Sequence, residues 1–243
     1  DPQSVFDVLS SLSEKKDDSD FKKIVSKMLL KDRNGRYTAK KVRDAMSDYL
    51  DIRPGKQEFE IKNDTLVIKG QGFMTKYAKP SDIPWNESRS AIKAINIGKK
   101  FINVGVYYFS NFSSLSKVAI PPGVRKICKY AFQMCKSLQE IVIPDTVISI
   151  DDNSFEKCEE LVHIRLPKVA TIGSSAFSEC TKLESVEFSM EMERIGRYAF
   201  QNTALTSVRI PYNVKCIEEG TFSGCEKLTK MDMPESVEKI LKK

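Results

Sequence analysis

A phenylalanine that recurs every 22 or 23 residues constrains this chain more than any other feature of its sequence. Leucine recurs in the same register, and so does proline, with Ser189 in its place once. A period of this length indicates a solenoid, because a unit so small must share its hydrophobic core with its neighbours. The recurring phenylalanines are Phe109, Phe132, Phe155, Phe177, Phe200 and Phe222.

Each repeat contains segments that predict local structure, as in residues 137–160, SLQEIVIPDTVISIDDNSFEKCEE. The pattern L-x-x-I-x-I has the apolar alternation and β-branched side chains of a short strand. Proline then ends the strand, since it has no amide hydrogen to donate. V-x-x-I predicts a second short extended segment. A/S/T-F-x-x-C predicts a turn of α- or 3₁₀-helix that places the phenylalanine in the core. Strands of successive units should pair in parallel about 4.8 Å apart.

The repeat resembles the BspA-type leucine-rich repeat family over about residues 59–243. The matching segments include SKVAIPPGVRKICKYAFQMC (116–135) and MDMPESVEKI (231–240), and TLVIKGQGFM (65–74), Trp85 and AIKAINIG (91–98) are similar to the segment that precedes the family's repeats. The resemblance implies a curved solenoid, a leucine-rich-repeat right-handed horseshoe or arc with a parallel concave sheet. It also implies a role in adhesion or other protein contacts and no enzymatic activity.

These observations predict an α+β repeat solenoid in three parts. Residues 1–55 carry apolar side chains at helical spacing, such as Phe21, Ile24, Val25 and Met28, and are predicted to form a small helical module. Residues 56–91 are predicted to be an N-terminal cap segment with a β-strand, in which Trp85 plugs the first repeat. Residues 92–243 are predicted to be the solenoid, with about six repeats, the last of them incomplete.

Four of the six cysteines share one repeat position and are interpreted as buried thiols that fill a slot in the core. Disulfides between neighbouring units are the alternative, although equivalent side chains of a ladder point the same way. The paired C-x₂₋₄-C ligands of a zinc site are absent from the sequence, and no metal site or cofactor is predicted. Cys128 and Cys216 lie off the ladder and are predicted to be more exposed and more reactive. The ladder cysteines are Cys135, Cys158, Cys180 and Cys225.

The single histidine, His163, bears on whether the chain is an enzyme. A nucleophilic triad would have to use it. It lies at an outward position of the strand 161–166, beside Arg165, and is interpreted as a contact residue. The sequence therefore predicts a protein without enzymatic activity, and a hidden enzyme that depends on His163 is the alternative.

The third and fifth residues of L-x-x-I-x-I should face outward, because neighbouring strand residues point to opposite faces. Over the repeats they form two columns, which begin at Ala94 and Asn96 in the first strand and continue through Ala119 in the second. Solenoids use such extended surfaces for binding. The predicted partner-binding residues are Lys117, Glu140, Val142, His163, Arg165, Ser185, Glu187, Ser207, Arg209, Lys230 and Asp232.

The predicted partner is a protein that binds this concave face, and the alternative is a structural or scaffold role in a larger assembly through the helical module and the solenoid ends. The net charge is +6, but the columns mix both signs, which argues against nucleic acid. No apolar run reaches the roughly 18 residues of a membrane span. The resemblance implies a cell-surface location, whereas no signal peptide is visible and the cysteines look unpaired, which favours the cytoplasm. The incomplete last repeat predicts weak self-association.

Overall fold

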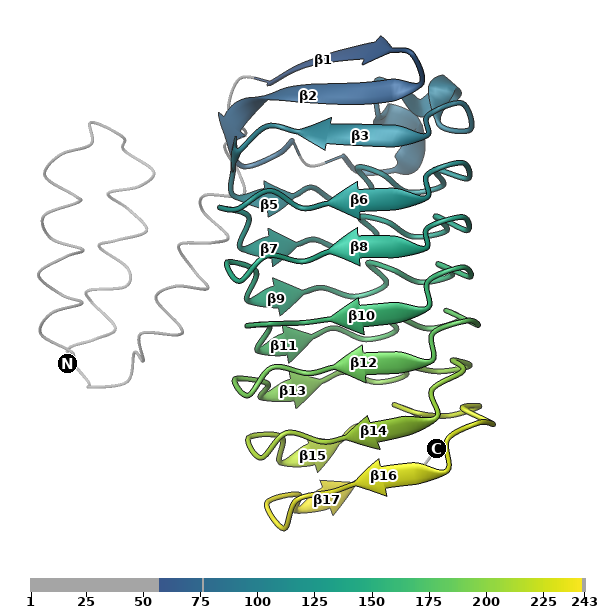
Figure 1. Ribbon diagram of the computed structural model, residues 1–243. Helices are drawn as coiled ribbons and strands as arrows, with labels where there is room; N and C mark the ends of the chain where they lie inside the picture. Colours follow the sequence, from purple (N-terminus) through teal and green to yellow (C-terminus); the bar gives the residue numbers. More distant parts are fainter. Residues whose placement is uncertain (1–56, 76, 242–243) are drawn as a thin grey trace, which may run out of the picture. The chain divides into compact units, whose positions relative to one another are not determined.

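The computed structural model describes residues 57–75 and 77–241. The helical module predicted for residues 1–55 lies outside these residues. Each repeat contributes one strand of three residues from L-x-x-I-x-I and one of two residues from V-x-x-I, and Figure 1 shows the two series stacked along the solenoid. The three-residue strands are β6 (Lys117–Ala119), β8 (Glu140–Val142), β10 (His163–Arg165), β12 (Ser185–Glu187), β14 (Ser207–Arg209) and β16 (Lys230–Asp232).

The two-residue strands form the second series. They are β5 (Asn103–Val104), β7 (Lys126–Ile127), β9 (Ser149–Ile150), β11 (Thr171–Ile172), β13 (Arg194–Ile195), β15 (Cys216–Ile217) and β17 (Lys239–Ile240). One five-stranded parallel sheet contains β5, β7, β9, β11 and β13 in chain order, and β15 pairs with β17. In the first series β6 pairs with β8, β10 with β12 and β14 with β16, all in parallel. The predicted parallel solenoid of about six turns is confirmed.

A β-hairpin covers the first turn of the solenoid. Its strands β1 (Gln57–Lys62) and β2 (Thr65–Gly72) are antiparallel, and β2 continues the stack by pairing in parallel with β3 (Ala94–Ile97) and β4 (Lys100–Phe101). Two short 3₁₀-helices follow β2, η1 (Pro80–Asp82) and η2 (Asn86–Ser88). Trp85 lies between them, is 3% exposed, and donates from Nε1 to the carbonyl oxygen of Tyr108 at 3.0 Å. Its side chain therefore closes the first turn, as the sequence predicts.

The recurring phenylalanines form a continuous stack through the core. From Phe109 to Phe222 each ring lies face to face with the next, with centroids 5.2–5.8 Å apart and interplanar angles of 4–24°. This spacing follows the separation of paired strands, so each ring contacts the ring of the unit before and of the unit after. The first five phenylalanines are fully buried, whereas Phe222 is half-buried. The stack explains the strict spacing of phenylalanine in the sequence.

The segment that carries each phenylalanine is a turn, and the predicted turn of helix is wrong. Residues two before and two after the phenylalanine have positive φ, for example Tyr130 (60°) and Met134 (59°) around Phe132. A left-handed residue cannot continue a right-handed helix. The amides instead point along the solenoid: Phe132 N donates to Ser154 O at 2.7 Å and Met134 N to Glu156 O at 2.8 Å. Within the described residues the solenoid turns are thus all β and turn, and the 3₁₀-helices lie in the cap.

Two glycines lie where the backbones of neighbouring units approach each other closely. Gly173 follows β11 and Gly196 follows β13, at equivalent positions of successive repeats. A Cβ atom on Gly173 would lie 2.4 Å from the amide nitrogen of Asp152, and one on Gly196 would lie 2.5 Å from the carbonyl carbon of Gly173. Such distances are far below van der Waals contact. Only glycine fits at these two positions without separating the units.

Candidate functional site

The predicted binding residues all lie exposed on one face of the three-residue strands, which we call the strand face. Each strand has an outward–inward–outward pattern, so that the middle residue, such as Ile164 of β10, enters the core. The register aligns the outward residues: Lys117 pairs with Glu140, His163 with Ser185, and Ser207 with Lys230. The strand face consists of Lys117, Glu140, Val142, His163, Arg165, Ser185, Glu187, Ser207, Arg209, Lys230 and Asp232, all exposed.

Most charged side chains of the strand face pair with each other. Lys117 Nζ lies 2.9 Å from a Glu140 carboxylate oxygen, and Arg165 Nε lies 3.5 Å from Glu187. Lys230 and Asp232 pair within one strand at 3.7 Å. Exposed pairs of this kind contribute about 0–1 kcal/mol each to stability. They therefore set the pattern of charge on the face more than they hold the fold together.

His163 has two polar neighbours that resemble a catalytic triad. Its Nδ1 lies 2.7 Å from Ser185 Oγ, and its Nε2 lies 3.5 Å from a Glu187 carboxylate oxygen. A triad needs an orienting hydrogen bond of about 2.6–3.2 Å and preorganised donors for an oxyanion. The 3.5 Å distance is too long, and Glu187 also contacts Arg165. His163 is exposed at an outward strand position, as strand alternation predicts, and its role as a contact residue stays a prediction.

The ladder cysteines donate hydrogen bonds along the core. Cys135 Sγ lies 3.0 Å from the carbonyl oxygen of Phe109, and the same bond joins Cys158 to Phe132 at 3.3 Å and Cys180 to Phe155 at 3.1 Å. Each thiol thus reaches the carbonyl of the phenylalanine one repeat earlier. These three side chains are fully buried, which agrees with their interpretation as core thiols. Burial raises the pKa of the Cys135 thiol to about 12.

Cys128 is buried, so its predicted exposure is wrong. Its side chain is 4% exposed, and it accepts a hydrogen bond at 3.3 Å from Asn103 Nδ2, itself buried. Asn103 Oδ1 in turn accepts from the backbone amide of Met74, in the segment after the hairpin. The printed contact of Cys128 thus comes from β5 in the first turn, and the segment after the hairpin holds Asn103 in place. Cys216 is half-buried, as is Cys225 of the ladder.

We expect the cysteines to differ strongly in their rate of modification. A thiol with a pKa of about 12, like that of Cys135, is a thiolate in only about one molecule in ten thousand at pH 8. Cys216 should react first with a thiol-specific reagent, and Cys135 and Cys158 last, which mass spectrometry of timed samples would reveal. Equal rates in the native protein, with urea-unfolded protein as reference, would contradict the buried ladder.

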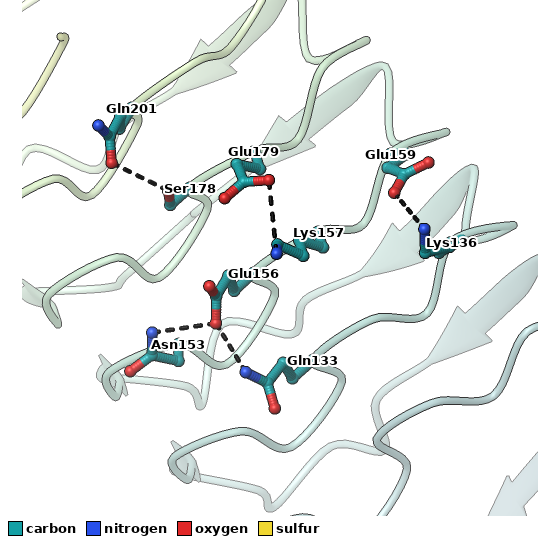
Figure 2. Close-up of polar contacts among 9 residues, drawn as sticks. All are labelled: Gln133, Lys136, Asn153, Glu156, Lys157, Glu159, Ser178, Glu179 and Gln201. Carbon is teal, nitrogen blue, oxygen red and sulfur yellow. Dashed lines mark hydrogen bonds and ion pairs between the residues drawn. The ribbon is translucent and has the colours of Figure 1, made fainter.

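The phenylalanine turns carry a second polar surface, which we call the turn face. Figure 2 shows that its side chains pair between neighbouring repeats: Lys136 with Glu159 at 2.7 Å and Lys157 with Glu179 at 3.6 Å. Glu156 Oε2 accepts from Gln133 Nε2 at 2.7 Å and from Asn153 Nδ2 at 3.1 Å. Sequence reasoning missed these contacts. Opposite charges one repeat length apart were the signal for them.

Two exposed apolar side chains were also missed. Met190 and Tyr212 occupy the same repeat position, directly after the residue that ends the strand, and are 78% and 65% exposed. Other units carry Pro122, Asp145 or Lys168 there, so an apolar residue at a polar repeat position was the available signal. The last described turn also exposes apolar side chains, among them Ile240 and Leu241. Weak self-association through this turn stays a prediction.

Within residues 57–75 and 77–241 no three His, Cys, Asp or Glu side chains are grouped as they would be to hold a metal ion. In the same part of the chain no helix has the length and apolar character needed to cross a membrane.

Solved structures with similar folds come from several bacteria. A T. pallidum leucine-rich repeat protein is 27% identical, with a TM-score of 0.57, and the match covers 76% of this chain and 82% of that one. A leucine-rich cell surface protein of Faecalibacterium prausnitzii is 26% identical, with a TM-score of 0.58, over 74% of this chain and 53% of that one. The pneumococcal vaccine antigen PcpA, at 23% identity, a TM-score of 0.50 and coverage of 76% and 49%, shares the fold.

The repeat itself matches a known sequence family. The profile of the BspA type leucine-rich repeat region, in six copies, matches residues 87–191 and 163–243. Together these ranges span well over half of the chain. Comparison with curated protein sequences gives no significant match. The spacing of the repeat, its parallel turns and the profile match agree, and the chain belongs to the BspA-type leucine-rich repeat family.

Proposed function

We propose that this protein binds a protein partner through its strand face. The observation that carries the proposal is the register of that face, where exposed residues lie in two columns over six stacked strands. A solenoid offers such a surface as one extended site. Neither column is needed for the core, since the inward residues of the strands supply it.

The charge on the strand face favours a protein over a polyanion. The strand face carries four cationic side chains and three carboxylates, so its net charge is about +1 with His163 counted as neutral. A nucleic-acid groove would be mostly basic, because phosphate contacts supply much of the affinity. Mixed charges instead fix the register of a protein partner and exclude wrong partners.

Adhesion is the setting that the comparisons support within this proposal. The F. prausnitzii protein of similar fold is a cell surface protein. The match covers 53% of that chain, so the proposal extends to a location at the cell surface and not to that protein's partners. On this view the strand face of the present chain contacts a protein of another cell or of the surrounding matrix.

A pair of double variants tests which face binds. Arg165→Ala with Glu187→Ala removes an ion pair of the strand face. Lys157→Ala with Glu179→Ala removes an ion pair of the turn face. The nitrogen–oxygen distances of the two pairs are almost the same, and each pair joins neighbouring repeats. Wild-type protein and both variants serve as baits in quantitative affinity purification from the source organism, and each captured protein is then titrated against purified bait. We expect the strand-face variant to lose binding by about tenfold or more and the turn-face variant to keep it. The reverse order, or equal loss, would overturn the proposal.

A further inference from the structure

The two most exposed large apolar side chains of the described residues lie side by side. Met190 follows β12 and Tyr212 follows β14, so they occupy the same corner of successive repeats. Asn213 Nδ2 donates a hydrogen bond to the carbonyl oxygen of Met190 at 3.1 Å, which joins the two corners directly. We call Met190, Tyr212, Arg209, Lys215 and Lys168 the corner patch.

Neither exposed side chain contributes to the buried core. The equivalent position is Pro122, Asp145, Lys168 or Glu235 in other repeats, so the fold accepts polar residues there. Exposing two large apolar groups to water side by side is unfavourable, because each leaves apolar surface hydrated. Tyrosine, methionine and arginine are the residue types enriched in the cores of protein interfaces. The corner patch contains all three.

The cations of the corner patch are not neutralised as those elsewhere on the strand face are. Arg209 is the last residue of β14, and in the described part of the chain no carboxylate lies within ion-pair distance of it, or of Lys168 or Lys215. Lys215 Nζ lies 4.9 Å from the centre of the Tyr212 ring, in a cation–π contact. Carboxylates also lie near the patch: Glu191 is next to Met190, Asp232 is the register partner of Arg209, and Glu235 holds the same corner position in the next repeat. What distinguishes Arg209 is therefore that it has no ion-pair partner among the described residues, and not an excess of positive charge.

We propose that the corner patch binds a protein segment in which an apolar side chain stands next to a carboxylate. The apolar side chain packs between Met190 and Tyr212 and removes their surface from water. The carboxylate pairs with the guanidinium of Arg209, which can donate two parallel hydrogen bonds to it. The inference rests on the proposed function, since Arg209 belongs to the strand face, and it adds the chemistry of the partner.

Methyl resonances provide a direct test. The full chain, labelled with ¹³C-methyl methionine, is titrated with three capped octapeptides of leucine and aspartate, leucine and lysine, or serine and aspartate. The Met190 resonance is assigned with Met190→Leu. We expect the leucine–aspartate peptide alone to shift the Met190 methyl resonance in a saturable way. Arg209→Gln and Tyr212→Ala should each weaken that binding about tenfold.

Two matched variants keep this test separate from that of the proposed function. Asp145→Ala changes the same corner position two repeats before Met190 and should leave peptide affinity unchanged. The strand-face double variant Arg165→Ala with Glu187→Ala should also bind the peptide normally, whatever it does to capture of a whole partner. A failure of the strand face would therefore leave the peptide result intact.

Several outcomes would overturn the inference. An equal response to the serine–aspartate peptide would show that charge alone suffices, and an equal response to the leucine–lysine peptide would show that the carboxylate is not recognised. No Met190 shift with any peptide would do the same. A shift with phosphatidylglycerol vesicles but none with the leucine–aspartate peptide would assign the patch to an anionic membrane surface instead.

Discussion

Replacing Phe155 with alanine is expected to lower the free energy of unfolding by about 3–5 kcal/mol. Phe155 is fully buried and stacks at both faces, against Phe132 at 5.3 Å and Phe177 at 5.2 Å. Its removal leaves a cavity in the middle of the stack, where neither neighbouring repeat can close the gap without breaking its own ladder. Urea unfolding followed by circular dichroism measures the loss.

Phe222→Ala is the matched control for this prediction. Phe222 is half-buried and stacks against Phe200 on one side, with centroids 5.8 Å apart. We expect its loss to cost less than half as much as that of Phe155, since part of its surface is already in water. Fluorescence of Trp85, in the cap, reports whether the first turn unfolds together with the rest. Equal costs for the two variants would show that the stack does not act through burial.

Replacing Gly196 with alanine is expected to cost about 1–3 kcal/mol, although the change adds a single methyl group. The new Cβ would lie 2.5 Å from the carbonyl carbon of Gly173 and 2.6 Å from the amide nitrogen of Ser174. The units cannot separate freely, because Gly196 N donates to Ile172 O at 2.9 Å. Overpacking against backbone therefore has to be absorbed by distortion of the ladder. Thermal unfolding compared with wild type checks the result.

Glu218→Ala tests the same repeat position where a side chain is already present. Glu218 follows β15 as Gly196 follows β13, and its ion pair with Arg194, at 3.6 Å, is partly exposed. We expect the change to stay within about 0.5 kcal/mol. If Gly196→Ala were as mild as Glu218→Ala, the close approach of the units would not be a determinant of stability.

The parts of the structure set by periodicity could be predicted from the sequence. The phenylalanine interval predicts the number of turns, and strand alternation places Arg165 and Glu187 outside and Ile164 inside. Trp85 was predicted to close the first turn because its segment resembles that of the family. In each case one repeat constrains the others, so that a signal too weak in a single unit becomes clear in six.

The parts of the structure that depend on the sign of φ, or on contacts outside the repeat pattern, could not be predicted from the sequence. Tyr130 and Met134 adopt positive φ, yet neither is a residue type that indicates it. The turn therefore looks like a helix in the sequence. Cys128 is buried and bonded to Asn103 of β5, a contact that the repeat pattern does not describe. The corner patch was missed because Met190 and Tyr212 stand at a repeat position that usually carries no apolar residue.

The amides of the phenylalanine turns donate to the next unit, whereas those at the two-residue strands donate to the previous unit, as Gly173 N does to Ile150 O. Hydrogen bonds between neighbouring turns have a mechanical consequence. Hydrogen bonds such as Phe155 N to Ala176 O, at 2.8 Å, lie along the axis of the solenoid. A force that pulls the ends apart would load them one turn at a time, from the outermost turn inward, and not all at once. Each turn released would lengthen the chain by some 22 extended residues, or about 70–80 Å. A tether built this way yields in equal steps under load, and a contact on its intact turns survives while others are drawn out.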